Sequence, residues 1–226
     1  MTFSLTARCQ DTGMLGMVIS SSSPAVAARC VHLRAGAGAV ASQNITDPAL
    51  GQIGLDLLAR GLSASEVRDA LVASTPFIAY RQLAVVDTRG GVASYSGANT
   101  LGIHAIHPGD GVIAAGNLLA NEQVPAAMVR SYQTNVGKPF VERLVAALQA
   151  GLDQGGEAGP VHSAGLCVVR DMSWPIVDLR VDWSDRPIAA LAEVWSVYAG
   201  QVEDYVRRAS NPSAASPFGV AGESLA

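Results

Sequence analysis

The residue at position 2 carries two groups that can do chemistry together. Thr2 follows Met1, and its side chain is small enough for an aminopeptidase to remove Met1. The α-amine released in this way has an ordinary pKa of about 7.7–8.0, so it can accept the proton of the threonine hydroxyl directly or through a water. Thr2 would then be a nucleophile with its own base. Many proteins begin with Met-Thr without such an activity, so the hypothesis depends on a rigid setting for this residue.

The remaining chemically capable side chains are scattered along the sequence. The four histidines are His32, His104, His107 and His162. His104 and His107 are three residues apart, but no helix is predicted there to bring them to one face, so we interpret them as loop histidines and expect no metal or other cofactor. The serine run from Ser20 to Ser23 ends a predicted strand. We interpret it first as turn-forming, and second as lining a ligand site, with Ser21 as the candidate.

Familiar enzyme signatures are absent from the sequence. It contains no GxSxG elbow, no Walker A motif, no GxGxxG after a strand and no HExxH. An internal nucleophile from the serine run or Ser163, with Lys138 or His162 as base, is a further hypothesis, although nothing in the spacing brings these groups together.

Composition excludes several classes of protein. The 226 residues are 49% hydrophobic and 15% charged, which indicates one folded domain, expected at residues 1–209, followed by a flexible tail at 210–226. No apolar run approaches the roughly 20 residues that span a bilayer. The formal net charge of −4 gives no footprint for nucleic acid. Low charge and abundant apolar residues favour a homo-oligomer, a dimer or higher.

The cysteines and the first residues indicate a compartment. Cys9, Cys30 and Cys167 are odd in number, widely spaced and outside any CxxC motif, so we interpret them as reduced thiols. The start MTFSLTAR lacks the basic and apolar regions of a signal peptide. We expect a cytoplasmic protein.

The elements that must position Thr2 follow from hydrophobic periodicity and turn chemistry. Strands are predicted at 2–8, 14–20, 35–43, 81–87, 92–96, 112–115, 163–170 and 176–181. Helices are predicted at 48–60, from a capping box at Ser63 to Glu66, after a cap at Asn121, at 139–150 and, as one long helix, at 187–209. Because this order has no simple βαβ rhythm, a mostly antiparallel sheet system covered by helices is favoured.

The whole chain resembles a family of bacterial proteins, domain of unknown function 1028, assigned to the N-terminal nucleophile (Ntn) hydrolase superfamily. The residues that carry the resemblance are Thr2-Phe3-Ser4, GAGAVASQ at 36–43, GQIGLDLLARG at 51–61, Arg81-Gln82 leading into VVD, Gly116-Asn117-Leu118-Leu119, QGGE at 154–157, Ser163-Ala164 and DLRVD at 178–182. The resemblance implies an α+β fold, a four-layer α/β/β/α sandwich of two mostly antiparallel sheets. It also implies hydrolysis of a linear amide-type C–N bond.

The resemblance also implies site residues. Thr2 falls at the nucleophile position, with Asn117 and Gln43 as donors to the oxyanion of a tetrahedral intermediate, or alternatively as satisfied buried amides. Arg81 and Gln82 open a strand, where Arg81 either grips a substrate carboxylate or forms an internal ion pair.

Glu157 and Ser163 border the Gly-rich loop and are candidates to contact substrate or orient Thr2. Glu157 is alternatively an ordinary loop carboxylate. The sequence departs from the family here, because it has Glu157-Ala158-Gly159-Pro160 and His162 where the family usually has Asp-Arg-Arg-Gly and glutamine. Two positive charges are missing, so the departure predicts a changed substrate or a lost activity, with His162 as a sign of the change.

The leading expectation is an N-terminal threonine amidohydrolase that cleaves an amide or ureido bond in a small, carboxylated substrate. The alternative is a non-catalytic small-molecule binding or assembly module on the same fold. The two differ in whether Thr2 has a free amine.

Overall fold

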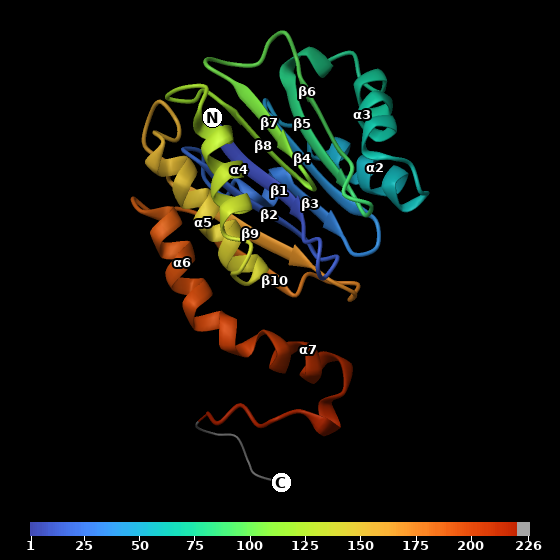
Figure 1. Ribbon diagram of the computed structural model, residues 1–226, viewed down its shortest axis with the longest axis vertical. Helices are drawn as coiled ribbons and strands as arrows, with labels where there is room; N and C mark the ends of the chain where they lie inside the picture. Colours follow the sequence, from blue (N-terminus) through green and yellow to red (C-terminus); the bar gives the residue numbers. More distant parts are fainter. Residues whose placement is uncertain (221–226) are drawn as a thin grey trace.

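The computed structural model describes residues 1–220, and their strands form two antiparallel sheets (Figure 1). The six-stranded sheet has the order β10-β9-β2-β1-β8-β7, with bounds Val177–Val181, Ser163–Val169, Leu15–Ser21, Thr2–Arg8, Val112–Asn117 and Ala105–Gly109. The four-stranded sheet has the order β3-β4-β5-β6, with bounds Val31–Arg34, Gly38–Asn44, Arg81–Asp87 and Val92–Ser96. The predicted hairpins β1–β2 and β5–β6 are both present.

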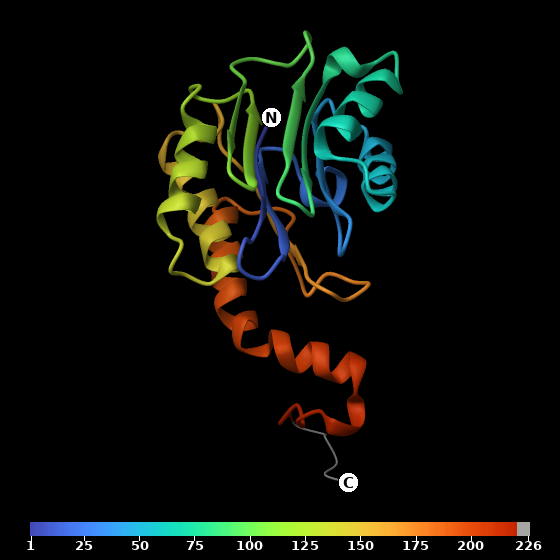
Figure 2. The ribbon, with the colours of Figure 1, turned by 45° about the vertical axis from the view of Figure 1, so that its right-hand side comes forward.

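The sheets stack face to face and helices cover their outer faces (Figure 2). Helices α2 (Pro48–Ala59) and α3 (Ala64–Ala73) pack on the four-stranded sheet. Helices α4 (Val124–Thr134) and α5 (Phe140–Asp153) pack on the six-stranded sheet, and the short α1 (Ala27–Cys30) follows β2. This four-layer α/β/β/α sandwich confirms the predicted α+β fold class.

Strand pleating divides the buried residues of β1 between two layers. Successive side chains of a strand point to opposite faces, so Phe3, Leu5 and Ala7 enter the core beneath α4 and α5. The even-numbered residues of β1 therefore face the other sheet, as the contact between Ser4 and Gln43 of β4 demonstrates. Most of the space between the sheets is filled by apolar side chains: Leu15, Met17, Ala39, Ala41, Ala84, Val86, Ile113 and Val169. The polar end of the space between the sheets lies at Thr2.

Helix ends follow the predicted capping chemistry with small shifts. Ser63 and Glu66 form a complete capping box at the start of α3. Asn121 does not cap α4 directly, because Gln123 holds the cap position and the Asn121 side chain accepts the Gln123 N–H at 2.9 Å. Helix α5 continues two residues beyond Gly151, to Asp153.

Three strands differ from the prediction, and two of them, β3 and β7, were not predicted at all. The predicted strand at 35–43 begins later, because Gly36 (φ +71°) and Gly38 (φ +155°) adopt backbone conformations that favour a turn and separate β3 from β4. Strand β7 was not predicted, since its sequence AIHPG has a proline and no clear alternation. It lies at the sheet edge, where a proline is tolerated.

The long C-terminal helix predicted at 187–209 is wrong as a single element. The structure has α6 (Pro187–Tyr198), a 3-10 turn, η2 (Ala199–Gln201), and α7 (Val202–Ser210), with Gly200 inside the turn. Helix α6 packs on β9 and β10, and α7 projects from the body as an arm (Figure 1). The short turn η3 (Pro212–Ala214) follows, and η1 (Ile78–Tyr80) precedes β5. The predicted flexibility of 210–226 stays a prediction, and 221–226 lie outside the described residues.

Candidate functional site

Thr2 opens β1 at the polar end of the space between the sheets. It is 4% exposed and lies opposite Asn117 of β8 in the strand register. Residues directly opposite each other in an antiparallel pair project to the same face, so the Asn117 side chain accompanies Thr2 into this space. The Met1 carbonyl accepts hydrogen bonds from the hydroxyls of Thr2 and Ser21. Met1 itself is 41% exposed, so the bond that an aminopeptidase would cleave joins an exposed residue to a buried one.

A chain of buried amides crosses from one sheet to the other beside Thr2. Ser4 donates to Gln43 Oε1 at 2.8 Å, and Gln43 Nε2 donates to Gln82 Oε1 at 2.8 Å. Asn117 Nδ2 donates to the same Gln82 oxygen at 3.1 Å. Gln82 Nε2 in turn donates to Ser96 and to the Gly116 carbonyl, each at 3.0 Å. Gln82 therefore fixes both amides that the resemblance implied as oxyanion donors.

One atom of this network has no partner. Asn117 Oδ1 has no hydrogen bond, and the Asn117 side chain is completely buried. A buried acceptor in this state costs about 1–3 kcal/mol unless a water or a ligand supplies the donor. The next residue, Leu118, has φ +51°, a strained conformation of the kind that clusters at functional sites.

Glu157 faces the start of the chain from the Gly-rich loop. It is 4% exposed, and both carboxylate oxygens lie 3.2 Å from the Ser22 amide, which donates to them. Burial raises the pKa of Glu157 to about 7, against the opposing effects of the Ser22 contacts, the positive charge of the chain's N-terminus and His162. The loop is anchored by a bridge between Glu157 and Leu119, two residues after Asn117.

Ser163 and Ser21 lie beside Glu157, and their hydroxyls form hydrogen bonds with backbone groups. The Ser163 hydroxyl donates to the Ser23 carbonyl at 2.6 Å and accepts the Val26 amide at 3.2 Å, which fixes the turn after β2. Ser21 combines its bond to Met1 with acceptance of the Ser23 amide at 3.0 Å. Ser163 thus shapes the wall of the site, whereas Ser21 reaches the residue that processing would remove.

His162 and Arg81 are engaged elsewhere. The His162 ring stacks on Trp183 with centroids 4.4 Å apart, and its Nδ1 lies 3.3 Å from the Ser184 carbonyl. Arg81 donates to the Ile45 carbonyl and lies 3.9 Å from an Asp47 carboxylate oxygen. The internal ion pair that we considered as an alternative for Arg81 is therefore present.

The structure also separates several groups. Lys138 lies in the connection between α4 and α5, and Tyr132 near the end of α4 contacts Arg8, so this connection is at the far end of β1 from Thr2. Lys138 is consequently too distant to serve a nucleophile at Ser20–Ser23 or Ser163. Within residues 1–220, no three His, Cys, Asp or Glu side chains are grouped as metal ligands would be. No described helix is long and apolar enough to cross a membrane.

Sequence reasoning missed three contributors: Ser4, Ser22 and Ser96. Ser4 was detectable in principle, because it shares the inward parity of Thr2 on the same strand. The Ser22 contribution is a backbone amide, which side-chain chemistry does not reveal. Ser96 depends on the pairing of β5 with β6, in which it lies opposite Gln82.

The fold and the site together define a two-sheet sandwich in which a buried threonine begins a central strand. The family model described as "Family of unknown function (DUF1028)" matches residues 2–191, and the chain belongs to this family. A crystal structure of a DUF1028-family protein from Silicibacter pomeroyi is similar, with TM-score 0.84 and 29% identity over 92% of this chain and 94% of that one. No protein with a curated description matches.

More distant likenesses involve Anbu, the ancestral β-subunit. Anbu from Yersinia bercovieri has TM-score 0.38 and 11% identity over 91% of this chain and 97% of its own. An Anbu mutant from Hyphomicrobium sp. strain MC1 has TM-score 0.41 and 10% identity over 92% and 100%. At these TM-scores the two chains indicate nothing about the function of this one.

Proposed function

We propose that this protein is an amidohydrolase in which Thr2, after removal of Met1, attacks the carbonyl of a linear amide or ureido bond in a small, carboxylated substrate. The observation that carries the proposal is the position of Thr2. It is buried at the start of a central strand, faces the polar end between two sheets, and lies opposite Asn117. A strand held on both sides by hydrogen-bonded neighbours gives the amine and hydroxyl the rigidity that catalysis requires.

The reaction balances with groups of this chain alone. The Thr2 hydroxyl oxygen bonds to the substrate carbonyl carbon while its proton moves to the α-amine. The tetrahedral oxyanion collapses, the C–N bond breaks, and the leaving nitrogen takes the proton from the α-ammonium. Water then adds to the ester, with the α-amine again acting as the base. The second tetrahedral intermediate collapses, which releases the acid and restores the threonine hydroxyl.

Asn117 and Gln43 are the proposed oxyanion donors. Each side-chain amide carries two N–H groups, and the bond to Gln82 occupies one of them. The second N–H of each is available to a charge that develops on the substrate oxygen, and such donors contribute most when preorganised in a dry site. Glu157 is the proposed partner of the Thr2 amine or of a substrate amine, because the charge of the Met1 amine already acts on it and removal of Met1 would move the terminal amine to the adjacent residue.

Substitution of Thr2 tests the proposal. The untagged protein is analysed by intact mass, then assayed with a panel of N-carbamoyl and N-acyl amino acids for release of ammonia or amino acid. Thr2→Val should abolish turnover, by at least about 10³-fold, while Thr2→Ser retains a measurable fraction. The matched control is Thr6→Val, on the same strand and face, whose hydroxyl has no partner. Equal activity of Thr2→Val and wild type, or a retained Met1 in an active enzyme, would refute the mechanism.

One observation favours the alternative, a non-catalytic binding or assembly module. The Met1 carbonyl accepts bonds from two hydroxyls, Thr2 and Ser21, so an unprocessed start is well accommodated. Retention of Met1, together with tight binding of a panel compound without turnover, would establish this function instead.

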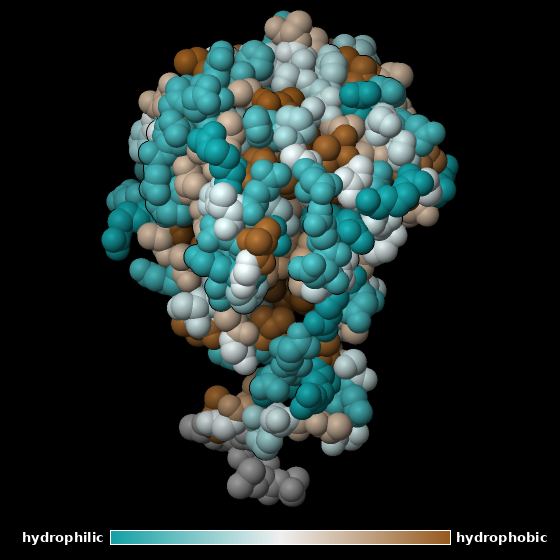
Figure 3. Space-filling view, viewed as in Figure 1, coloured by the Kyte–Doolittle hydropathy of each residue, from teal (hydrophilic) through white to brown (hydrophobic). Residues whose placement is uncertain are grey.

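The proposal includes a cytoplasmic homo-oligomer. Cys9, Cys30 and Cys167 are all free and buried, as suits a reducing compartment. Figure 3 shows apolar side chains where the body meets the arm, around a cavity of about 400 Å³ lined by residues that include Phe140, Ile176 and Trp195. Val197 on α6 is 69% exposed. Light scattering of the full chain should give a mass of two or more protomers, and a monomer at micromolar concentration would contradict it.

A further inference from the structure

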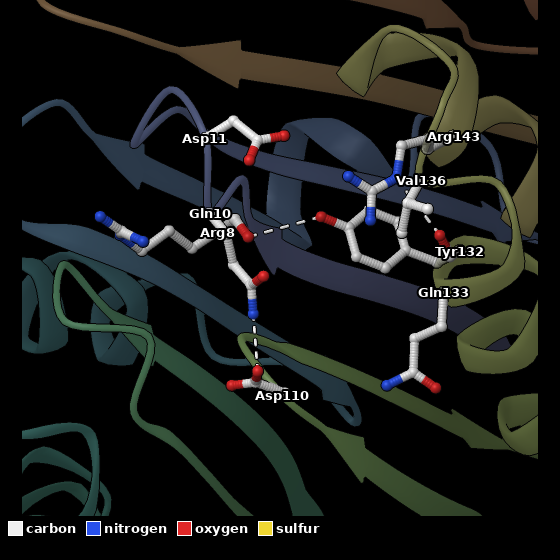
Figure 4. Close-up of a pocket in the computed structure, with 8 residues that line it drawn as sticks. All are labelled: Arg8, Gln10, Asp11, Asp110, Tyr132, Gln133, Val136 and Arg143. Carbon is white, nitrogen blue, oxygen red and sulfur yellow. Dashed lines mark hydrogen bonds between the residues drawn. The ribbon is translucent and has the colours of Figure 1, made fainter.

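A polar cavity lies at the opposite end of β1 from Thr2. It has a volume of about 260 Å³ and is lined by Arg8, Gln10, Asp11, Asp110, Tyr132, Gln133, Val136 and Arg143 (Figure 4). Arg8 is six positions after Thr2, and a strand rises about 3.3 Å per residue, so the cavity is roughly 20 Å from the proposed nucleophile. It is therefore a separate site, and its role does not depend on the proposed function.

The wall of this cavity contains a buried arginine without an acidic partner. Arg143, in the first turn of α5, is 8% exposed, and its guanidinium lies 3.9 Å from the centroid of the Tyr132 ring. Its Nε donates to the Tyr132 carbonyl at 3.2 Å. Within residues 1–220, no carboxylate lies within 4 Å of this guanidinium, and its two terminal nitrogens donate to no protein atom. These terminal nitrogens open into the cavity, where an anion can pair with them.

Two neighbouring residues, Arg8 and Tyr132, also determine what the cavity can bind. Arg8 also has no carboxylate within 4 Å among the described residues, and its Nε is buried without a partner. Tyr132 donates its hydroxyl to the Arg8 carbonyl at 3.4 Å, and burial raises the pKa of Tyr132 to about 12. The tyrosine hence stays neutral, and Arg143 and Arg8 supply the positive charge in the cavity wall.

Acidic side chains stand at the rim instead of the base. Asp11 and Asp110 are both exposed, and Asp110 accepts a hydrogen bond from Gln10 Nε2 at 2.6 Å. Figure 4 shows Asp11 across the cavity from Arg143, with Gln10 and Asp110 on another side. The cavity thus presents a buried cation in its wall and exposed anions at its rim.

We propose that this cavity binds a small zwitterion of the α-amino acid type. Its carboxylate would pair with the terminal nitrogens of Arg143, and its ammonium group would face Asp11 at the rim. The arginine fork matches a carboxylate in geometry and charge. A volume of about 260 Å³ accommodates a molecule of this size but not a polymer.

Calorimetric titration with three related probes tests the proposal. L-alanine carries both charges, propionate only the anion, and ethylammonium only the cation. We expect L-alanine to bind at least tenfold more tightly than either of the others. Arg143→Met keeps the aliphatic stem against Tyr132 and should weaken L-alanine binding at least tenfold, whereas Arg130→Met, an exposed control on α4, should leave it unchanged.

Asp11→Asn provides a variant in which folding is not at risk, because this residue is exposed. It should weaken L-alanine binding about three- to tenfold and leave propionate binding unchanged. The proposal is overturned if L-alanine does not bind the wild type, if propionate binds as tightly as L-alanine, or if both variants bind L-alanine like the wild type.

Discussion

At the scale of the residue, Glu157 is held in conditions that oppose its own ionisation. Both of its oxygens share one donor, the Ser22 amide, and the side chain is almost completely removed from water. A carboxylate in this position needs a nearby cation, and the start of the chain supplies one. The protonation of Glu157 is therefore linked both to folding and to the state of residue 2.

This linkage predicts a pH dependence of stability. Because the folded-state pKa of Glu157 is raised, the folded protein keeps a proton that the unfolded chain loses between pH 4.5 and about 7, so this group's contribution to stability falls as pH rises through that window. Glu157→Gln removes the effect. Its melting temperature relative to wild type should rise from pH 4.5 to 7.5, as measured by calorimetry.

Glu66→Gln is the matched control, with the opposite sign. Hydrogen bonds from Ser63 lower the pKa of Glu66, so its contribution is present above pH 4.5 and lost as pH falls through the folded-state pKa. The melting temperature of Glu66→Gln relative to wild type should therefore fall as pH rises from the folded-state pKa of Glu66 to 4.5, and stay constant from pH 4.5 to 7.5. Parallel behaviour of the two variants would contradict our account of Glu157.

At the scale of the element, close contact between layers depends on small residues. Helix α2 crosses β3 at Gly51, where an added Cβ would lie 2.1 Å from the His32 ring. The ring is itself buried and its Nε2 lies 3.2 Å from the Arg29 carbonyl, so it cannot move aside easily. Gly51 thus sets how closely α2 approaches the four-stranded sheet, which carries Gln43 and Gln82.

Gly51→Ala should consequently destabilise the protein, although alanine favours helix. The clash is expected to cost about 1–3 kcal/mol, against a gain in helix propensity of about 1 kcal/mol. The net loss is measurable by denaturant unfolding. Ile53→Ala, at an exposed position of the same helix, is the control and should change stability by less than about 0.5 kcal/mol. If Gly51→Ala is more stable than wild type, the His32 ring can move to accommodate the added Cβ.

Local patterns predicted the elements around the site better than the contacts within it. The β1–β2 and β5–β6 hairpins follow from alternation and turn residues, which lie close together in the sequence. The bonds from Ser4 to Gln43 and from Gln82 to Gly116 join segments 39 and 34 residues apart and depend on how two sheets stack. A pattern along one strand contains no information on that stacking, so the amide network could not be predicted.

At the scale of the whole molecule, the residues after Arg186 divide into a part that supports the core and a part that does not. Ile188 and Leu191 of α6 are almost completely buried against the six-stranded sheet. Arg208 of α7 lies 3.7 Å over the ring of Phe218, which follows this helix, so the contact is within the arm itself. The family match also ends at residue 191, before most of the arm.

Truncation after Ser210 should therefore leave the fold intact, with a change in the free energy of unfolding of less than about 0.5 kcal/mol. Truncation after Arg186 removes Ile188 and Leu191 from the core and should cost at least about 4 kcal/mol. Circular dichroism melts of both proteins measure the difference. Loss of soluble protein in the shorter truncation, after Ser210, would refute the division.

The pleat of β1 determines what an inserted residue at the start of this strand would do. Phe3 and Leu5 lie beneath the helices because of their parity, so β1 cannot slip by one residue without turning both toward the polar end of the site. A residue inserted between Met1 and Thr2 would therefore not be absorbed by the strand, and it would occupy the place of the amine. Under the proposed mechanism such an insertion would abolish catalysis while leaving the fold unchanged.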